Sequence, residues 1–377
     1  MKIIAFYLPQ FHEIPENNEW WGKGFTEWVN VKKAQPLFEG HTQPRQPLND
    51  NYYNLLNTDV IRWQANLAKK YGVYGFCFYH YWFDGHMLLE KPVENFLDAT
   101  DIDQNFCICW ANEHWTNAWV SGKNKVLIEQ RYGKKKEWKE HFDYLLPFFR
   151  DRRYIKEDNM PLFVIYRPEI IDCLNQMLDY WNELAIQAGF NGIKFAYQHI
   201  DFDLKDNKDD SRFTYDIEYQ PTYAQALIRQ KKHSTLRKLK RKIAFAAEKY
   251  FKMDIRYVHT ESLIKFDYDT IWNYILNMKP VSPKSLPGAY VNWDNTPRRG
   301  NKGIVHLNVT PEKFKNYLCQ QIRRAKEVYH TDKLFLFAWN EWAEGGFLEP
   351  DKEWNYSMLE AVKEALEIND EFESDDI

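Results

Sequence analysis

The chain has 377 residues, of which 44% are hydrophobic and 28% are charged, and its formal net charge is -4. This apolar content excludes a disordered, collagen-like or low-complexity chain, and the length allows one large domain or two ordinary ones. The near balance of charge argues against nucleic acid as the main partner, because a phosphate-binding surface usually leaves a basic excess over the whole domain.

Aromatic side chains are unusually frequent. The chain contains 15 Trp, 24 Tyr and 25 Phe, which together make up 17% of its residues. Tryptophan is bulky, carries an N–H that needs a partner and is seldom fully buried. The excess therefore predicts a large surface or cleft lined with amphipathic rings, in addition to a core.

Short apolar runs alternate along the chain with longer stretches of helical periodicity. In chain order, the predicted strands are Ile3–Leu8, Val73–Tyr79, Phe106–Trp110, Leu162–Tyr166, Ile193–Tyr197, Tyr215–Tyr219, Ala289–Trp293 and Leu334–Trp339. The predicted helices are Asp59–Tyr71, Leu89–Leu97, Lys136–Phe149, Ile171–Ala188, Thr235–Phe251, Tyr268–Met278 and Pro311–Val328, the last with Thr310 as its cap. Most strands are nearly continuous apolar runs, which is typical of parallel strands covered on both faces.

This alternation predicts an α/β protein, a (β/α)₈ TIM barrel that forms a single domain over residues 1–368, with an acidic flexible tail over 369–377. The alternative is a doubly wound open sheet, but no Gly-rich phosphate loop follows any predicted strand. Two connections are longer than usual: the first βα loop, Pro9–Asn57, and a helical insertion after the sixth strand. Long loops in compact domains are often functional.

The cellular setting is predicted from three features. The five cysteines are odd in number and form no Cys-x-x-Cys pair, which is typical of reduced thiols. The first apolar run is too short for a secretory signal, and no stretch approaches the length of a membrane span. We therefore expect a cytoplasmic protein. The basic run Arg229–Lys242 predicts either a solvated helix face or a peripheral contact with an anionic membrane.

Polar and aromatic residues follow nearly every predicted strand. In a barrel, these positions face the active site. Aromatic rings bind the C–H faces of sugars, and carboxylates, amides and guanidiniums bind their hydroxyls, although a single Tyr or Trp can instead plug the barrel. The predicted substrate is therefore an oligosaccharide or polysaccharide, and the predicted substrate-binding residues are Tyr7, His12, Trp28, Tyr79, His80, Trp82, Trp110, Asn112, Glu113, Trp115, Arg167, Asp294, Asn340 and Trp342.

Two glutamates, Glu341 and Glu344, come just past the last predicted strand in the run FAWNEWAEGGFLEP. Glycoside chemistry needs two carboxyl groups, one to protonate the leaving oxygen and one to assist through a nucleophile. Carboxyl groups held close in a desolvated cleft acquire different pKa values, as separate acid and base roles require. The flanking Trp339, Trp342 and Phe347 favour a shielded cleft over a solvated loop.

Five long motifs carry a resemblance to a known family. They are AFYLPQFHEIPENNEWWGKGFTEWVNVKKAQPLFEGHTQPRQP, YGFCFYHYWFDG, CWANEHW, PGAYVNWDNTPRRG and AWNEWAEGGFLEP, and they resemble the WbsX-type glycosyltransferase-like proteins of bacterial surface-polysaccharide clusters. Through DNTPRRG and NEWAEG the chain is also similar to the endo-α-mannosidases of glycoside hydrolase family 99, which are (β/α)₈ barrels. The first-strand region departs from the hydrolase pattern.

The resemblance implies a mechanism. Glu341 would be the base that deprotonates a sugar 2-hydroxyl, which then attacks its own anomeric carbon, and Glu344 would be the general acid and then base. Retention of configuration is implied, without a metal or a nucleotide cofactor. Asp294 and Arg298 match the D-x-T-x-R pattern, and both are expected to bind sugar hydroxyls.

Other interpretations remain open. Three Asp-x-Asp pairs, at 101/103, 201/203 and 267/269, could hold a metal on a nucleotide sugar, although their positions favour exposed loops. No spacing links His80, His114 and His199 as a metal site, so sugar binding or packing is expected of them. The alternatives to a glycosidase are thus a sugar-nucleotide-dependent glycosyltransferase of O-antigen or capsule synthesis, and a non-catalytic glycan-binding protein.

Overall fold

The computed structural model describes residues 1–116, 126–200, 204, 209–230 and 263–372. Its main strands are parallel, and each pairs with its neighbours in chain order, which confirms the predicted (β/α)₈ TIM barrel. The strands of the barrel are β1 (Lys2–Tyr7), β2 (Val73–Phe83), β4 (Asn105–Trp110), β8 (Met160–Ile165), β9 (Lys194–His199), β10 (Phe213–Glu218), β12 (Ser285–Leu286) with β13 (Gly288–Tyr290), and β15 (Lys333–Phe337).

The seventh strand closes the barrel through two short segments. β12 pairs with β10, β13 pairs with β15, and Pro287 lies between the two segments. Proline lacks an N–H and interrupts a strand ladder, which explains the division. The strand begins at Ser285, earlier than the predicted run Ala289–Trp293. The prediction missed the first half because Pro287 interrupts the apolar run there.

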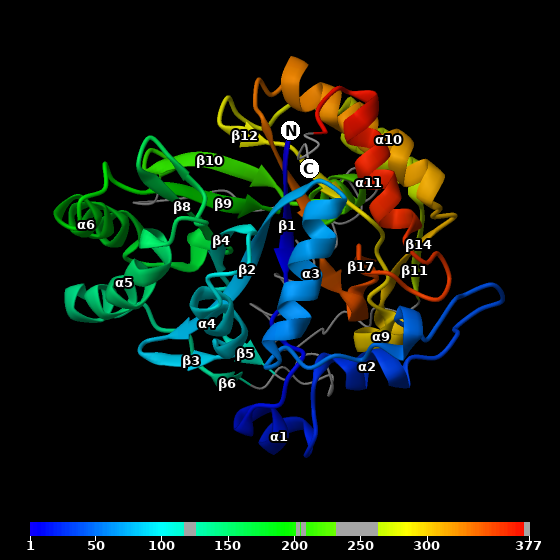
Figure 1. Ribbon diagram of the computed structural model, residues 1–377, viewed down its shortest axis with the longest axis horizontal. Helices are drawn as coiled ribbons and strands as arrows, with labels where there is room; N and C mark the ends of the chain where they lie inside the picture. The colour runs from blue at the N-terminus through cyan, green and yellow to red at the C-terminus, as the bar shows by residue number, and fades with distance from the viewer. Residues whose placement is uncertain (117–125, 201–203, 205–208, 231–262, 373–377) are drawn as a thin grey trace, which may run out of the picture.

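Helices cover the outside of the barrel (Figure 1). They are α3 (Thr58–Lys70), α4 (Lys91–Asp98), α5 (Lys135–Arg150), α6 (Leu174–Gln187), α8 (Tyr268–Asn277), α10 (Pro311–Glu327) and α11 (Ser357–Ile368). The Thr310 hydroxyl caps α10 by accepting a hydrogen bond from the Lys313 N–H at 3.2 Å, as predicted. Helix α11 was not among the predicted elements.

Shorter helices, 3₁₀ turns and strands lie in the connections between the main elements. They are α1 (Pro15–Trp21), α2 (Glu27–Lys33), α9 (Thr296–Arg299), the 3₁₀ turns η1 (Leu48–Asp50), η2 (Pro168–Ile170), η3 (Gly300–Lys302) and η4 (Trp342–Glu344), and the strands β3 (His86–Leu88), β5 (Trp115–Thr116), β6 (Val126–Ile128), β7 (Lys156–Glu157), β11 (Ile264–Asp267), β14 (Ile304–Leu307), β16 (Asn340–Glu341) and β17 (Gly346–Phe347). In Figure 1, β1 points towards α1, α2 and α9, so these helices lie at the carboxyl end of the barrel.

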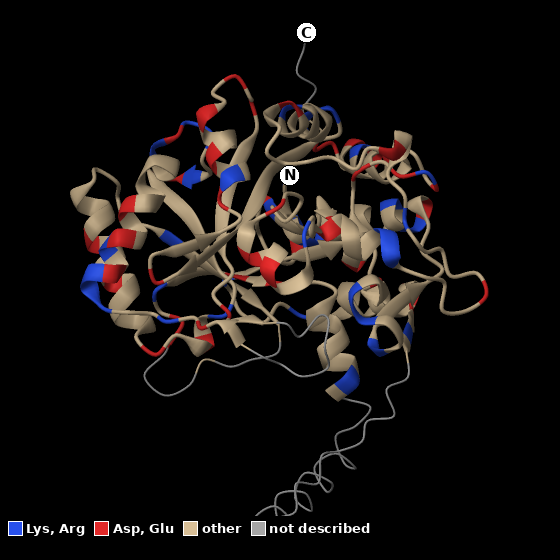
Figure 2. Ribbon diagram, turned by 90° about the horizontal axis from the view of Figure 1, so that it is seen from below, with Lys and Arg blue, Asp and Glu red and all other residues tan. Residues whose placement is uncertain are grey.

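The interior of the barrel is packed with aromatic rings. The ring of Phe6 stacks on that of Tyr79 with centroids 5.6 Å apart, and the rings of Tyr219 and Phe337 meet edge to face at 5.7 Å. Lysines, arginines and acidic residues are interspersed over the described ribbon, in keeping with the near-neutral net charge (Figure 2). Among the described residues, no helix has both the length and the apolar character needed to cross a bilayer.

Several predictions fall wholly or partly outside the described residues. The helix Thr235–Phe251 lies outside them, as does most of the basic run, while residues 222–230 are helical. The first residues of the predicted tail contact the barrel: Asn369 donates to the Cys319 carbonyl at 3.2 Å, and Glu371 pairs with the N-terminal ammonium of Met1. Residues 373–377 lie outside the described part of the chain, so the division into barrel and tail stays a prediction.

Gly288 allows the seventh strand to approach its neighbour. A Cβ atom at this position would lie 1.8 Å from the carbonyl oxygen of Glu218, which is backbone and cannot move aside like a side chain. We therefore expect Gly288→Ala to lower the free energy of unfolding by about 1–3 kcal/mol. Urea unfolding measures this, with Lys279→Ala at an exposed position as a control that should change stability by less than about 0.5 kcal/mol. Equal stability of the two variants would contradict the prediction.

Candidate active site

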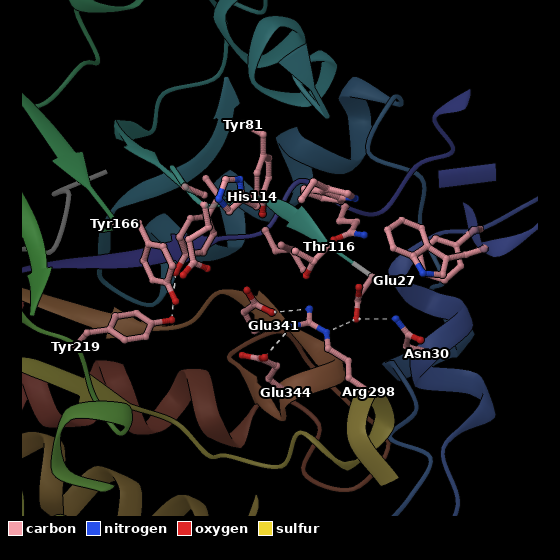
Figure 3. A pocket seen from close by; sticks show the side chains of 18 residues that line it. Glu27, Asn30, Tyr81, His114, Thr116, Tyr166, Tyr219, Arg298, Glu341 and Glu344 are labelled. Atoms are coloured by element: carbon pink, nitrogen blue, oxygen red, sulfur yellow. Dashed lines mark hydrogen bonds and ion pairs between the residues drawn. The ribbon is translucent and has the colours of Figure 1, made fainter. Parts of the chain in front are cut away.

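A pocket opens at the carboxyl ends of the barrel strands, and Figure 3 shows it from close by. Its volume is about 210 Å³. The aromatic residues that line it are Trp21, Phe25, Tyr79, Tyr81, Trp115, Tyr166 and Tyr219. The polar residues that line it are Gln10, Asn30, His114, Thr116, Glu27, Glu113, Arg298, Glu341 and Glu344.

Arg298 binds three carboxylates in this pocket (Figure 3). Its Nε donates to Glu27 Oε1 at 2.8 Å, its Nη1 to Glu344 Oε1 at 2.7 Å and its Nη2 to Glu341 Oε2 at 3.2 Å. Only 9% of the arginine side chain is exposed, and the exposed fractions of Glu27, Glu341 and Glu344 are 2%, 6% and 12%. One guanidinium thus faces three carboxylates away from bulk water, an excess of negative charge that favours a proton on one of them.

The pKa of Glu341 reflects this setting. It is raised from 4.5 to about 8: burial is the largest cause, the positive charge of Arg298 opposes the rise, and the negative charges of Glu344 and Glu27 add to it. Glu341 therefore exchanges its proton near neutral pH, as a group that takes and returns protons must do.

Stability should depend on pH through Glu341. The pKa in the folded chain is above that in the unfolded chain, so folding is favoured most below pH 4.5, and this contribution is lost as pH rises through about 8. The Glu341→Gln variant lacks the titration. We expect the stability of the variant minus that of the wild type, measured by urea unfolding, to increase from about pH 5 to about pH 8. Other raised carboxyls, Glu218 and Glu349, cancel in this difference. A difference independent of pH would contradict the prediction.

The turn that carries the two glutamates is tied to the barrel. The side chain of Asn340 bridges the backbone of Leu8, accepting from its N–H at 2.7 Å and donating to its carbonyl at 3.0 Å. The indole N–H of Trp342 donates to the carboxyl of Glu349 at 2.6 Å, and burial raises the pKa of that carboxyl to about 7. Both contacts fix the backbone on either side of Glu341.

The glycine that ends the Glu-Trp-Ala-Glu-Gly run, Gly345, is required by its backbone conformation. It ends η4 with φ of +70°, a left-handed conformation that favours glycine. A Cβ there would lie 2.9 Å from the backbone nitrogen of Asp294. That N–H donates to the Glu344 carbonyl at 2.7 Å, so the turn after β13 and the turn after β15 are held together at the pocket.

The aromatic wall of the pocket suits a hydroxyl-rich ligand. Burial raises the pKa values of Tyr79, Tyr81 and Tyr219, so their phenols stay neutral and can donate. The indole nitrogens of Trp21 and Trp115 are buried and have no hydrogen-bond partner among the described residues. These unpaired N–H donors suit the hydroxyl oxygens of a sugar, and the aromatic ring faces beside them suit its apolar C–H faces.

Six of the residues predicted from the sequence line this pocket together. They are Tyr79, Glu113, Trp115, Arg298, Glu341 and Glu344. Glu113 lies next to Arg167, whose Nη1 donates to its carboxylate at 2.6 Å, and burial raises the pKa of Glu113. Arg167 also pairs with Glu169 and does not itself line the pocket.

Four predicted residues contact the covering helices instead. Tyr7 donates to Gln64 of α3 at 2.6 Å, and His80 bonds to His141 of α5 at 2.9 Å. Trp82 stacks on the same histidine at 4.5 Å, and the ring of Trp110 lies 6.0 Å from that of Trp181 in α6. Side chains alternate across a strand, and these four lie on its outward face, where they pack against the helices and do not line the pocket. Their part in substrate binding stays a prediction.

The remaining predicted residues brace the loops around the pocket. His12 bonds to the Pro9 carbonyl, Trp28 donates to the Tyr53 carbonyl and packs against Trp342, and Asn112 binds the backbone of Arg167. Asp294 accepts from Thr296, Gln43 and His41, and these hydrogen bonds lower its pKa despite burial. The side chains of His12, Trp28, Asn112, Asp294, Asn340 and Trp342 do not line the pocket.

Glu27 and its neighbours were missed. Trp21, Phe25, Glu27 and Asn30 all come from the first βα loop, which was expected to be functional only because of its length. An acidic residue among aromatic ones, in the run FTEWVN, was the available signal. Its partner Arg298 lies 271 positions away along the chain, and sequence alone gives no means to pair them.

The Asp-x-Asp pairs have structural roles where they are described. Asp101 and Asp103 form exposed ion pairs with Arg62 and Lys69. Asp267 caps α8 by accepting from the Thr270 N–H at 3.1 Å, and Asp269 pairs with a lysine of α10. None of these four lines the pocket, and the pair at 201 and 203 lies outside the described residues.

Comparisons with known proteins give a family and a fold. A family model described as Glycosyltransferase WbsX matches residues 3–362. Two proteins described as uncharacterized protein WxcX, from Xanthomonas campestris pv. campestris strains B100 and ATCC 33913, are 35% identical over 370 and 374 residues. These alignments cover 97% of this chain and 49% of each relative, so the chain spans about half the length of the curated relatives it matches.

Solved structures resemble the whole barrel. An endo-α-mannosidase of glycoside hydrolase family 99 from Bacteroides thetaiotaomicron, in complex with bis-tris-propane, has a TM-score of 0.55 and 13% identity, covering 98% of this chain and 96% of its own. A glycoside hydrolase-like protein has a TM-score of 0.59 and 12% identity, covering 97% and 93%. At these identities the likeness is one of fold.

Proposed function

The chain belongs to the WbsX glycosyltransferase family, and from that membership we propose that it breaks or remakes a glycosidic bond of a glycan, with Glu341 and Glu344 as the catalytic pair. One observation carries the proposal: a single guanidinium, that of Arg298, binds both carboxyls in a pocket walled by tyrosines and tryptophans. Paired carboxyls beside aromatic rings are what glycoside chemistry requires.

The proposed reaction has two halves. In the first, the Glu341 carboxylate takes the proton of a sugar 2-hydroxyl, and the freed oxygen bonds to the anomeric carbon of its own ring. The glycosidic C–O bond breaks as Glu344 gives its proton to the leaving oxygen. In the second, Glu344 takes a proton from water, the water oxygen bonds to the anomeric carbon, and the 2-oxygen leaves it and regains its proton from Glu341. A sugar hydroxyl in place of water would make a new glycosidic bond, with retention in either case.

The electrostatics support these roles. A carboxylate whose pKa is raised by burial holds a proton more firmly, so ionised Glu341 is a stronger base than an exposed glutamate. Arg298 keeps both carboxyls within reach of one ligand because it binds one with each terminal nitrogen. Rigid orientation of this kind lowers the barrier by removing the need to assemble the groups.

The substrate and setting are also proposals. We propose a mannoside-like glycan of surface-polysaccharide metabolism, lipopolysaccharide O-antigen or capsule, handled in the cytoplasm. The family's description as a glycosyltransferase supports a glycan substrate, and the fold shared with an endo-α-mannosidase of family 99 is the reason for proposing a mannoside. The alternative reaction is glycosyl transfer, which the family description names, with a sugar nucleotide as the donor.

The test is an incubation with defined glycans. The purified protein is mixed with manno-oligosaccharides and with O-antigen oligosaccharides, each with and without nucleotide sugars, and the products are separated by mass. Shorter or rearranged glycans formed without a nucleotide sugar are the expected result. Extension only in the presence of a nucleotide sugar would favour the alternative, and binding without any product would favour a glycan-binding protein.

A further inference from the structure

Glu27 contacts the proposed catalytic centre from outside the barrel proper. We propose that Glu27 is a positioning residue of the reaction, because it holds the Arg298 guanidinium in the one orientation that lets it bind Glu341 and Glu344 together. This inference rests on the proposed function of those two glutamates. Glu27 itself is not proposed to touch the reacting atoms.

The geometry of the guanidinium carries the inference. A guanidinium is planar, and its donors point in fixed directions within that plane. Glu27 occupies Nε at 2.8 Å, which leaves Nη1 and Nη2 to the two catalytic carboxyls. Because Nε is bound to Glu27, any rotation of the Arg298 guanidinium would break its hydrogen bond to that buried carboxylate. The third carboxylate therefore determines where the other two bonds point.

Glu27 is itself held in place on three sides. Its backbone N–H donates to the Gln10 carbonyl at 2.9 Å, which ties α2 to the end of β1. The amide of Asn30 donates to its carboxylate at 3.3 Å. The next residue, Trp28, packs on Trp342 with ring centroids 5.3 Å apart, so α2 rests directly on the turn that carries the catalytic pair.

Glu27 also adds a charge to the site. The charged groups that face Glu341 are Arg298 from α9, Glu344 from η4 and Glu27 from α2, and the neutral phenols of β2 and Tyr219 face it from the barrel. The negative charge of Glu27 raises the pKa of Glu341, so its removal should lower that pKa.

Two variants separate reach from charge. Glu27→Asp keeps the charge but is one methylene too short to reach Nε, so we expect kcat to fall roughly tenfold to a hundredfold, with a smaller change in KM. Glu27→Gln keeps the reach but removes the charge, so the acid limb of the pH profile of kcat should move to lower pH. Glu39→Gln removes the same charge from an exposed position of the same loop and should match the wild type.

A second readout does not need turnover. The protein is labelled with ¹³C at the glutamate carboxyls, the Glu341 signal is assigned with Glu341→Gln, and its titration is followed in the wild type and in Glu27→Gln. A lower pKa is expected in Glu27→Gln, and Glu27→Asp, titrated in the same way, should also shift the pKa because Arg298 loses its Nε partner while the charge stays. A pKa of Glu341 that is unchanged in both variants would overturn the inference.

The outcomes keep the two proposals apart. If the wild type makes no product from any glycan, the proposed function fails, while the NMR titration still tests Glu27. If the wild type makes product and both Glu27 variants behave like Glu39→Gln, the inference about Glu27 fails and the proposed function stands.

Discussion

Replacing Arg298 with alanine is expected to lower the free energy of unfolding by about 3–5 kcal/mol, because it leaves three buried carboxyls without their common counter-charge. The side chains of Glu27, Glu341 and Glu344 have little access to water that could replace the guanidinium. The loss should be larger at pH 8 than at pH 5, since protons can neutralise the stranded carboxyls only at the lower pH.

Urea unfolding at both pH values measures the effect of Arg298→Ala. Arg299→Ala is the matched control, because it removes the same charge from the next position of α9, where the side chain is exposed. A loss of less than about 0.5 kcal/mol is expected for the control, as for most surface substitutions. Equal losses in the two variants, or a loss for Arg298→Ala that does not grow with pH, would overturn this account of the site.

Replacing Glu344 with glutamine should lower kcat by about 10²–10⁴-fold, the usual contribution of a positioned acid–base group. Glutamine has the same shape and can still accept from Nη1 of Arg298, so folding and glycan binding should be nearly unchanged. The rate of product formation and the affinity for a manno-oligosaccharide, measured by calorimetry, check both halves of the expectation.

The leaving group sharpens this prediction. The dinitrophenolate of a dinitrophenyl glycoside leaves without being protonated. A variant that lacks the general acid should therefore lose much less of the rate of the first step on this substrate than on an oligosaccharide. The exposed Glu360→Gln in α11 is the control, with wild-type rates on both substrates. If Glu344→Gln lost the same factor on both, Glu344 would not be the general acid.

The sequence predicted the barrel because the evidence for it is local. Each strand is a continuous apolar run and each helix has its own periodicity, so the eightfold alternation can be read one element at a time. The divided seventh strand was displaced in the prediction because Pro287 interrupts the pattern.

The same apolar runs hid which side chains enter the pocket. In β2, Tyr79 and Tyr81 line the pocket, whereas His80 and Trp82 contact α5. A strand covered on both faces is apolar on both, so no alternation of polarity reveals which face is inward. Aromatic residues at strand ends were therefore all assigned to the site, whereas in the structure only every second residue of a strand faces the pocket.

By itself, the sequence determined the fold class and the presence of two glutamates directly after the last barrel strand. Both follow from residues that are close in the chain. Only the tertiary structure decided that Glu27 from the first loop and Arg298 from α9 meet those glutamates, and that Tyr7 and Trp110 turn away. The reason is physical: a local pattern specifies an element and its ends, whereas an ion cluster depends on how distant loops converge once the barrel has closed.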